Sequence, residues 1–326
     1  MPQRFAQRKL PNSMRSSIVR LLVVTDVEPS SDIRRLDFVI IGAPKCGTTA
    51  LAQYLSLHPE VSLPDPYYEP GFFCTDFSSP SFVRNPATYY RQLRTKPNAK
   101  VFGEKTVWYL SSHDAPQRIH ENHPDVKVIV CLRDPVDAVY SMHRQQLLEG
   151  NEACKSLGRA LDLEWKRRLG KAIPLGCSFA AGLQYRYHAR FGTHLARWLT
   201  YFPKGRVMVI RREDLQANPR QTLTRLTKFL GLSSFDFVSP VTRRKNVEVR
   251  SQLLNRALTL ASTYARPYRN TGVGKVLRTV KNIVGSRLNL SERPRPELGS
   301  ALQRALREEF LMECELIERL VGVSLT

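Results

Sequence analysis

Short apolar runs alternate with amphipathic segments along most of the chain. The clearest runs, at 37–41 and 126–132, are rich in β-branched residues and predict buried parallel strands. Weaker runs predict strands at 61–63, 100–103 and 206–210. Because strands that alternate with helical segments build parallel sheets, the pattern predicts an α/β fold, with a central parallel sheet flanked by helices in a single domain.

Apolar residues spaced three or four positions apart predict the helices. The predicted segments are 50–58, 86–95, 114–122, 135–149, 156–169, 180–200, 219–230 and, as a closing helix, 297–320. Polar motifs follow several of the predicted strands, and parallel sheets bind ligands at the carboxyl ends of their strands. We therefore expect one composite site along that edge of the sheet.

The loop after the first predicted strand reads Gly42-Ala43-Pro44-Lys45-Cys46-Gly47-Thr48-Thr49. Its glycines let the backbone curl so that N–H groups point inward, and the following helix adds its positive end. The spacing is P-loop-like, but Thr48 stands where a Walker A loop has lysine, and Lys45 lies inside the loop. No convincing Walker B carboxylate follows, since the nearest candidate, Asp134, comes after an arginine. The loop thus predicts an anion site without the Mg²⁺-nucleotide machinery.

Composition narrows the class of partner. The chain has 50 Lys and Arg against 29 Asp and Glu, a net charge of +21, which predicts anionic partners such as nucleotides, nucleic acids or glycans. The 6 cysteines form no C-x-x-C pair and no zinc-like cluster with histidine, so we expect a reducing compartment and no metal. We interpret His113, His120 and His123 as part of a solvated helix face.

Two basic segments stand apart from the strand and helix pattern. The basic composition of residues 1–34 predicts a mobile extension that precedes a domain over 35–326. The apolar run 18–24 is short and interrupted by Arg20, so we expect no transmembrane anchor and a cytoplasmic protein. Residues 243–295 hold thirteen cations and two acids, with interspersed Gly and Pro. That composition predicts either solvated loops with some helix or a basic flap over an anionic ligand.

The loop sequence Pro44-Lys45-Cys46-Gly47-Thr48-Thr49 resembles the 5′-phosphosulfate-binding loop of the sulfotransferases. That family transfers a sulfonyl group from 3′-phosphoadenosine 5′-phosphosulfate (PAPS) to an acceptor hydroxyl or amine without a metal. The resemblance implies that Lys45 is catalytic and that the loop binds the donor. Arg133 and Ser141, with seven residues between them, are similar to the family's 3′-phosphate motif. A basic segment that reaches the nucleotide in relatives is matched by Asn246, Arg250 and Ser251.

Two more stretches resemble the heparan sulfate, or carbohydrate, branch of the family and its bacterial-type members. Residues 68–73 are similar to a Lys-Glu-x-x-Phe-Phe segment, which implies that Glu69 is the catalytic base, shielded by neighbouring aromatic residues. Residues 103–110 are similar to a Glu-Lys-Thr-Pro segment, which implies that Lys105 lies in the active cleft. The chain departs from the usual Lys, His and Asp of this branch at Tyr68, Gly71 and Cys74.

The leading interpretation is a PAPS-dependent sulfotransferase with a P-loop-like sheet, acting on a hydroxylated small molecule or glycan. One alternative is a P-loop kinase of a small metabolite, which Thr48 in place of the Walker lysine disfavours. The other is a nucleic-acid-binding protein, suggested by net charge. No RRM, zinc-finger or KH signature accompanies that charge, so we expect no specific nucleic-acid partner. The pattern leaves the oligomeric state open.

Overall fold

The computed structural model describes residues 36–93, 95–96, 98–237, 247–249, 251, 254, 257, 290–292 and 298–325. The predicted basic extension over 1–34 lies outside these residues. So do most of the basic segment 243–295 and, within it, Asn246 and Arg250.

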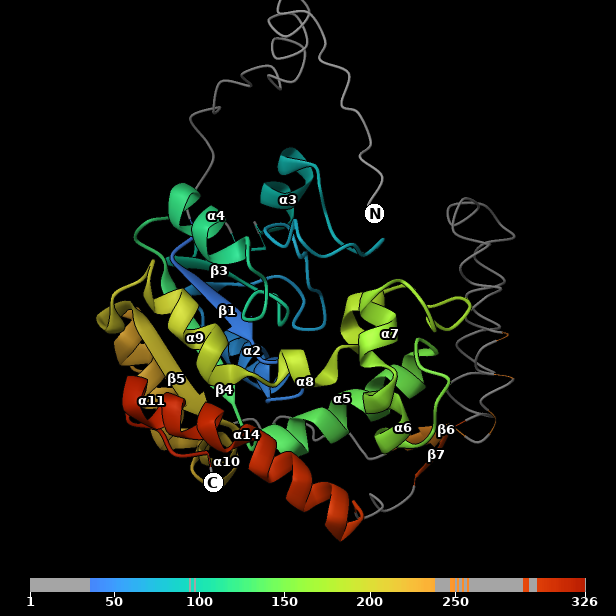
Figure 1. Cartoon of the computed structure of the whole chain (residues 1–326). Coiled ribbons are helices and arrows are strands. Elements are labelled where there is room, and N and C mark those ends of the chain that lie inside the picture. Colours follow the sequence, from blue (N-terminus) through green and yellow to red (C-terminus); the bar gives the residue numbers. More distant parts are fainter. Residues whose placement is uncertain are drawn as a thin grey trace, which may run out of the picture. The chain divides into compact units, whose positions relative to one another are not determined.

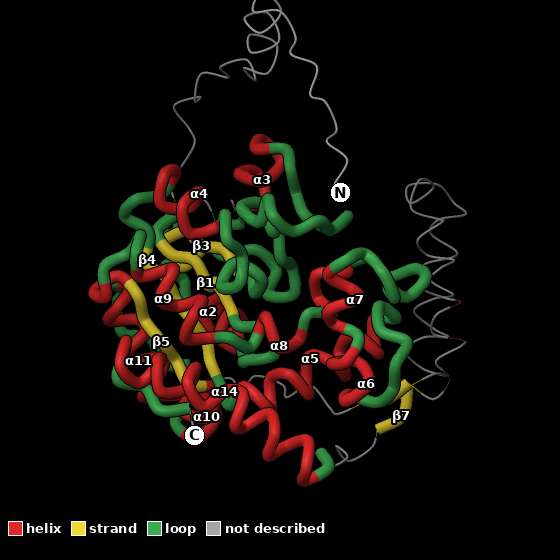
Figure 2. The backbone as a smooth tube through the Cα atoms, viewed as in Figure 1, coloured by secondary structure: helices red, strands yellow, loops and turns green. Residues whose placement is uncertain are grey.

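A parallel sheet of five strands, in the order β2-β3-β1-β4-β5, forms the centre of the described chain (Figures 1 and 2). Its strands are β1 Phe38–Gly42, β2 Val61–Ser62, β3 Val101–Lys105, β4 Lys127–Leu132 and β5 Val207–Arg211. All of β1 and nearly all of β4 is buried. Burial on both faces explains why these two strands have continuous apolar runs instead of alternation. The predicted α/β fold is confirmed.

Helices connect the strands and cover the sheet. They are α2 Thr48–Leu57, α3 Pro86–Leu93, α4 Ala115–Asn122, α5 Pro135–Glu149, α6 Leu157–Asp162, α7 Glu164–Arg168, α8 Tyr185–His188, α9 Phe191–Leu199, α10 Arg212–Ala217, α11 Pro219–Leu230 and α14 Ser300–Val321, with 3₁₀ turns η1 Ala180–Leu183 and η2 Lys204–Arg206. The closing helix α14 packs against α9 and α5, in front of the strands in Figure 1. Helices α9 and α14 approach closely at Gly192, where a Cβ atom would lie 2.7 Å from the backbone oxygen of Glu313.

The prediction of two long helices at 156–169 and 180–200 is wrong, because each segment is broken into shorter pieces. In the second segment the chain bends so that His188 and His194 both turn inward. Nε2 of His188 contacts the carbonyl oxygen of Ala181 at 2.8 Å, and Nε2 of His194 contacts that of Tyr187 at 2.7 Å. These buried contacts outweigh the local helical preference that the spacing suggested.

A second, two-stranded sheet was not predicted. β6 Val247–Val249 pairs antiparallel with β7 Leu290–Glu292. The prediction for this basic segment was either solvated loops with some helix or a basic flap over an anionic ligand. Strands of three residues are too short to produce a recognisable alternation. The pairing brings the two ends of the basic segment side by side.

The interpretation of the three histidines as solvated is wrong for His123. Its side chain is buried, and its Nδ1 accepts the backbone N–H of Leu36 at 3.2 Å, immediately before β1. A buried backbone N–H needs an acceptor, and the ring supplies it. His123 therefore stabilises the start of the central strand.

Candidate active site

Lys45, Lys105 and Arg133, all singled out from the sequence, lie at one edge of the sheet. Lys105 is the last residue of β3, the loop 43–47 follows β1, and Arg133 follows β4. Arg212 follows β5. Since these four strands are consecutive neighbours and parallel, their carboxyl ends lie in a row. The expected composite site at the strand ends therefore has the required geometry.

The shape of the loop after β1 is set by its backbone conformation and by a backbone hydrogen bond to β4. Gly42, Lys45 and Gly47 all have positive φ, of 148°, 65° and 92°. The N–H of Ala43 donates to the carbonyl oxygen of Cys131 at 2.7 Å, which ties the loop to β4. Among the described residues, no side chain caps the amino end of α2. The first-turn N–H groups of α2 can therefore bind an anion, whose charge the helix dipole favours.

Lys45 extends from this loop to α5. Its Nζ donates to Oε1 of Gln145 at 2.9 Å, and Gln145 in turn donates to Glu149 at 2.7 Å. Glu149 is within electrostatic range of both Lys45 and Glu69. The loop lysine and the expected base therefore face the same region of the site.

The other loop side chains divide into buried and accessible groups. Cys46 and Thr48 are buried, and burial raises the pKa of the Cys46 thiol to about 12. Thr49 is half-buried. Cys46 is consequently a neutral packing residue that can reach a ligand through its backbone only.

Glu69 and Lys105 form an ion pair, with Oε1 and Nζ 2.5 Å apart. The Lys105 side chain is only 2% exposed, whereas that of Glu69 is 24% exposed. Their two segments are joined further because the N–H of Gly71 donates to Thr106 Oγ1 at 3.1 Å. The structure thus brings together the expected base and the expected cleft lysine, which are far apart in the chain.

Two departures from the heparan sulfate pattern have structural explanations. Gly71 has a φ of 57°, and a Cβ atom on it would lie 2.2 Å from the ring of Phe82. The aromatic ring fills the space that a histidine would need. Cys74 is buried, and this burial raises the pKa of its thiol well above the ordinary value. Cys74 is therefore neutral and does not replace an aspartate.

The carboxylate that aromatic residues enclose is Glu104. Strand β3 extends two residues beyond its predicted end, so Glu104 lies within the strand and is fully buried. It accepts hydrogen bonds from the hydroxyls of Tyr89 at 2.6 Å, Tyr109 at 2.7 Å and Thr106 at 3.2 Å. Burial raises its pKa from 4.5 to about 7, although the three donors oppose the change. The expected shielding of Glu69 by neighbouring aromatic residues stays a prediction.

Replacing Glu104 with glutamine is expected to remove a pH dependence of stability. Between pH 4.5 and about 7 the unfolded chain releases this proton while the folded chain keeps it, so the free energy of unfolding falls as the pH rises. At about 1.4 kcal/mol per pH unit, the loss is about 3 kcal/mol. Denaturant unfolding at pH 5 and pH 8 checks this, with the exposed Glu121→Gln as control. An identical pH dependence in native protein and Glu104→Gln would contradict the assignment.

Arg133 leaves β4 and is nearly buried. Its guanidinium pairs with the carboxylate of Asp137, and among the described residues its Nε is buried without a hydrogen-bond partner. Asp134 accepts the N–H of Asp137 at 2.7 Å and so caps α5. Ser141 lies further along the same helix and is half-buried. The Nε of Arg133 is thus a buried donor without a hydrogen-bond partner among the described residues.

Arg212 is a site residue that the sequence reasoning missed. The Cβ atom that Gly47 lacks would lie 3.4 Å from Cγ of Arg212, so this side chain lies over the anion loop. Burial and the nearby charge of Arg133 both lower the pKa of Arg212. Two neighbouring guanidinium groups repel unless an anion lies near them. The signal in the sequence was its position, two residues after a predicted strand.

Ser251 is the one residue of the expected basic segment motif that the structure describes. It is half-buried, and its Oγ accepts the N–H of Leu254 at 3.3 Å. Its expected role in nucleotide binding stays a prediction.

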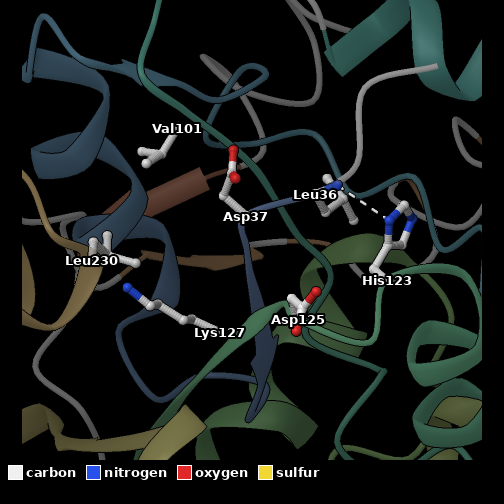
Figure 3. A pocket seen from close by; sticks show the side chains of 7 residues that line it. All are labelled: Leu36, Asp37, Val101, His123, Asp125, Lys127 and Leu230. Atoms are coloured by element: carbon white, nitrogen blue, oxygen red, sulfur yellow. Dashed lines mark hydrogen bonds between the residues drawn. The ribbon is translucent and has the colours of Figure 1, made fainter. Parts of the chain in front are cut away.

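A cavity of about 310 Å³ lies at the opposite edge of the sheet, at the amino ends of the strands (Figure 3). It is lined by Leu36, Asp37, Val101, His123, Asp125, Lys127 and Leu230. None of the expected site residues that the structure describes lines it. Within the described chain, no group of three or more His, Cys, Asp or Glu residues is placed to hold a metal ion. No described helix combines the length and apolar character of a membrane span.

Comparison with known proteins identifies the family. Residues 35–253 match the model of the sulfotransferase domain family. The chain belongs to the sulfotransferase family. This confirms the family to which the sequence resemblance pointed.

Two curated human sulfotransferases match part of this family member. Over 206 residues it is 31% identical to bifunctional heparan sulfate N-deacetylase/N-sulfotransferase 2, covering 61% of the chain and 22% of that protein. Over 194 residues it is 31% identical to heparan sulfate glucosamine 3-O-sulfotransferase 6, covering 60% of the chain and 52% of that protein. The chain thus spans between about a fifth and a half of the length of these relatives.

A solved structure supports the fold independently. The sulfotransferase from Alicyclobacillus acidocaldarius superposes with a TM-score of 0.64 at 22% identity, covering 89% of this chain and 97% of that one. At this identity the likeness shows a shared fold. It agrees with the predicted P-loop-like α/β architecture.

Proposed function

We propose that this chain transfers a sulfonyl group from PAPS to a hydroxyl or amine of a carbohydrate acceptor. The observation that carries the proposal is the Glu69–Lys105 pair, which stands at the strand end next to the Lys45 loop. The pair combines a partly exposed carboxylate with a buried cation, beside a loop shaped for an anion. Both human relatives are named for heparan sulfate, which favours a glycan acceptor.

The residues present fit the donor. Lys45, Arg133 and Arg212 supply three cations beside loop amides, and the buried Arg133 Nε is a donor suited to a phosphate oxygen. We assign the 5′-phosphosulfate to the loop 44–49, and the 3′-phosphate to Arg133 and Ser141. PAPS, when bound, supplies an activated sulfonyl group on a phosphate leaving group.

The chain's own side chains would then act in defined roles. As the acceptor oxygen or nitrogen bonds to sulfur, the bond from sulfur to the phosphate oxygen breaks, and Glu69 takes the acceptor proton. Lys45 and the loop N–H groups stabilise the negative charge that grows on the leaving oxygen, which belongs to adenosine 3′,5′-bisphosphate. No step in this scheme needs a metal.

The ion pair itself has a consequence for this chemistry. While the pair is intact, the Glu69 Oε1 contacts Lys105 Nζ and cannot take the acceptor proton. We propose that Lys105 turns toward the sulfonate oxygens when the donor is present, so that Glu69 is released to accept the proton.

The test is a transfer assay with labelled PAPS and a panel of acceptors, in excess EDTA. The panel contains glucosamine oligosaccharides with free, acetylated and sulfated amines, a simple alcohol and an amine. We expect one sulfonyl group to be added to at least one oligosaccharide, as read by mass spectrometry. A parallel assay replaces PAPS with ATP and EDTA with Mg²⁺. Phosphate transfer there, with no sulfonyl transfer to any acceptor in the first assay, would point to the kinase alternative.

Replacing Arg133 with alanine is expected to weaken binding of adenosine 3′,5′-bisphosphate far more than binding of adenosine 5′-monophosphate. A charged hydrogen bond contributes about 1.5–3 kcal/mol, so we expect a loss of about 10- to 100-fold for the bisphosphate only. Calorimetry measures both ligands, with the exposed Arg118→Ala as control and a melting curve for folding. Equal losses for the two ligands would place Arg133 away from the 3′-phosphate.

A further inference from the structure

Residues 164–175, which we call the α7 knuckle, expose an unusual set of side chains. The knuckle comprises α7 and the turn after it, and α7 lies beyond α5 and α8, away from the five-stranded sheet (Figure 1). Trp165 is 60% exposed, Leu169 63% and Leu175 70%. Ile173, between them, is also exposed. Clustered large apolar side chains on a surface mark a contact site, whereas single ones need no explanation.

The knuckle is anchored from beneath by an arginine. Arg167 is buried and pairs with the fully buried Glu152 at 2.8 Å. Its guanidinium also donates to the carbonyl oxygens of Ala160 and Ala172, each at 3.4 Å, so it joins both sides of the turn. The segment thus places an arginine inside and a tryptophan outside, the reverse of the usual distribution. Because these Arg167 contacts fix the backbone, the apolar side chains of the knuckle are exposed in the folded state.

Cations surround the apolar side chains. Lys166, Arg168 and Lys171 are exposed, and residues 165–175 contain no acid. The Lys166 Nζ lies over the ring of Trp165, 5.6 Å from its centroid. The acid that begins α7, Glu164, is buried and paired with Arg186. The surface is therefore both apolar and positively charged.

Charge complementarity identifies the partner. A second copy of the chain related by a twofold axis would place the same cations against one another, which is repulsive. A polyanionic glycan would neutralise the cations but leave Leu169, Ile173 and Leu175 in water. An anionic lipid surface accommodates both, since acyl chains take the apolar groups while headgroups bind the ammonium and guanidinium groups. We propose that the α7 knuckle docks the protein on an anionic bilayer surface.

The proposal goes beyond sulfonyl transfer and is tested independently of it. The full chain is sedimented with vesicles of phosphatidylcholine alone or of phosphatidylcholine with phosphatidylserine, and with vesicles that carry brominated acyl chains. We expect binding to the anionic vesicles only. Tryptophan fluorescence should be quenched by bromine, and this quenching should disappear in Trp165→Phe, because Trp108 is half-buried and Trp198 is buried.

A double variant tests the surface itself. Leu169→Ser with Leu175→Ser should reduce partitioning onto anionic vesicles by about tenfold or more, because two exposed side chains would no longer enter the acyl region. Both positions are exposed, so the melting temperature should be unchanged. The matched control is Leu311→Ser with Met312→Ser on α14, whose side chains are 50% and 63% exposed. This control should partition like the native protein.

Three results would overturn the proposal. One is equal binding of the native protein to neutral and anionic vesicles, or no binding to either. Another is undiminished anionic binding by the double variant, which would assign the effect to other parts of this basic chain. The third is loss of concentration-dependent self-association in the double variant with vesicle binding unchanged, which would make the knuckle an interface between copies.

Discussion

Replacing Glu69 with glutamine is expected to reduce turnover by a factor of about 10²–10⁴, the usual contribution of a positioned general base. Glutamine keeps the size and the carbonyl oxygen that faces Lys105 Nζ, but it cannot take a proton from the acceptor. Binding of adenosine 3′,5′-bisphosphate should change little, since the assigned donor contacts lie on the loop after β1 and after β4. The loss should therefore appear in kcat rather than in donor affinity.

Single-turnover transfer and calorimetry separate these two effects. Glu121→Gln on α4 is the matched control, because it makes the same change on an exposed helix. Turnover of Glu69→Gln within a few fold of the native protein would exclude Glu69 as the base. Glu104, which is buried in β3 and precedes Lys105, would then be the next carboxyl group to test.

Lys45→Ala is expected to lower turnover by a factor of about 10²–10³, typical of removing one preorganised electrostatic contact. The fold should survive, because the loop is tied to β4 through backbone atoms, from Ala43 N–H to the Cys131 carbonyl. Lysine and alanine both carry a Cβ atom, so the cost of the positive φ at this position is common to both. The loss is then attributable to the ammonium group.

The control for this change is Lys155→Ala, at an exposed position outside the site. Circular dichroism and melting establish folding, and the PAPS assay measures turnover. A folded Lys45→Ala protein with near-native turnover would refute the role of the loop lysine. Loss of donor binding without a change in kcat would instead assign Lys45 to ground-state binding.

Much of the central sheet and its loops was predictable from the local pattern of the sequence. The strands at 37–41 and 126–132 are long, apolar and β-branched, so burial on both faces leaves a continuous signal. The loop after the first of them could be read because its glycines and lysine are contiguous. Arg133 could be placed at a strand end for the same reason. These features depend on neighbouring residues, which a sequence displays directly.

Other features depend on segments distant in the chain, and only the tertiary structure decided them. Glu104 and Lys105 are adjacent, yet Glu104 is enclosed by Tyr89 and Tyr109 while Lys105 turns to Glu69. Alternation along a strand directs adjacent side chains to opposite faces, but the residues that pack against each face come from distant parts of the chain.

The same reason accounts for what was missed. Arg212 became a site residue because parallel pairing placed β5 beside β4, and strand order cannot be read from composition. The breaks in the predicted helix 180–200 follow from buried histidine contacts, and the exposed knuckle follows from the Arg167–Glu152 pair beneath it. The sequence by itself determined the strands of the central sheet, the anion loop and the family. Burial, charge pairing and the neighbours of each carboxylate were decided by the three-dimensional packing, because electrostatic environment is a property of space and not of chain order.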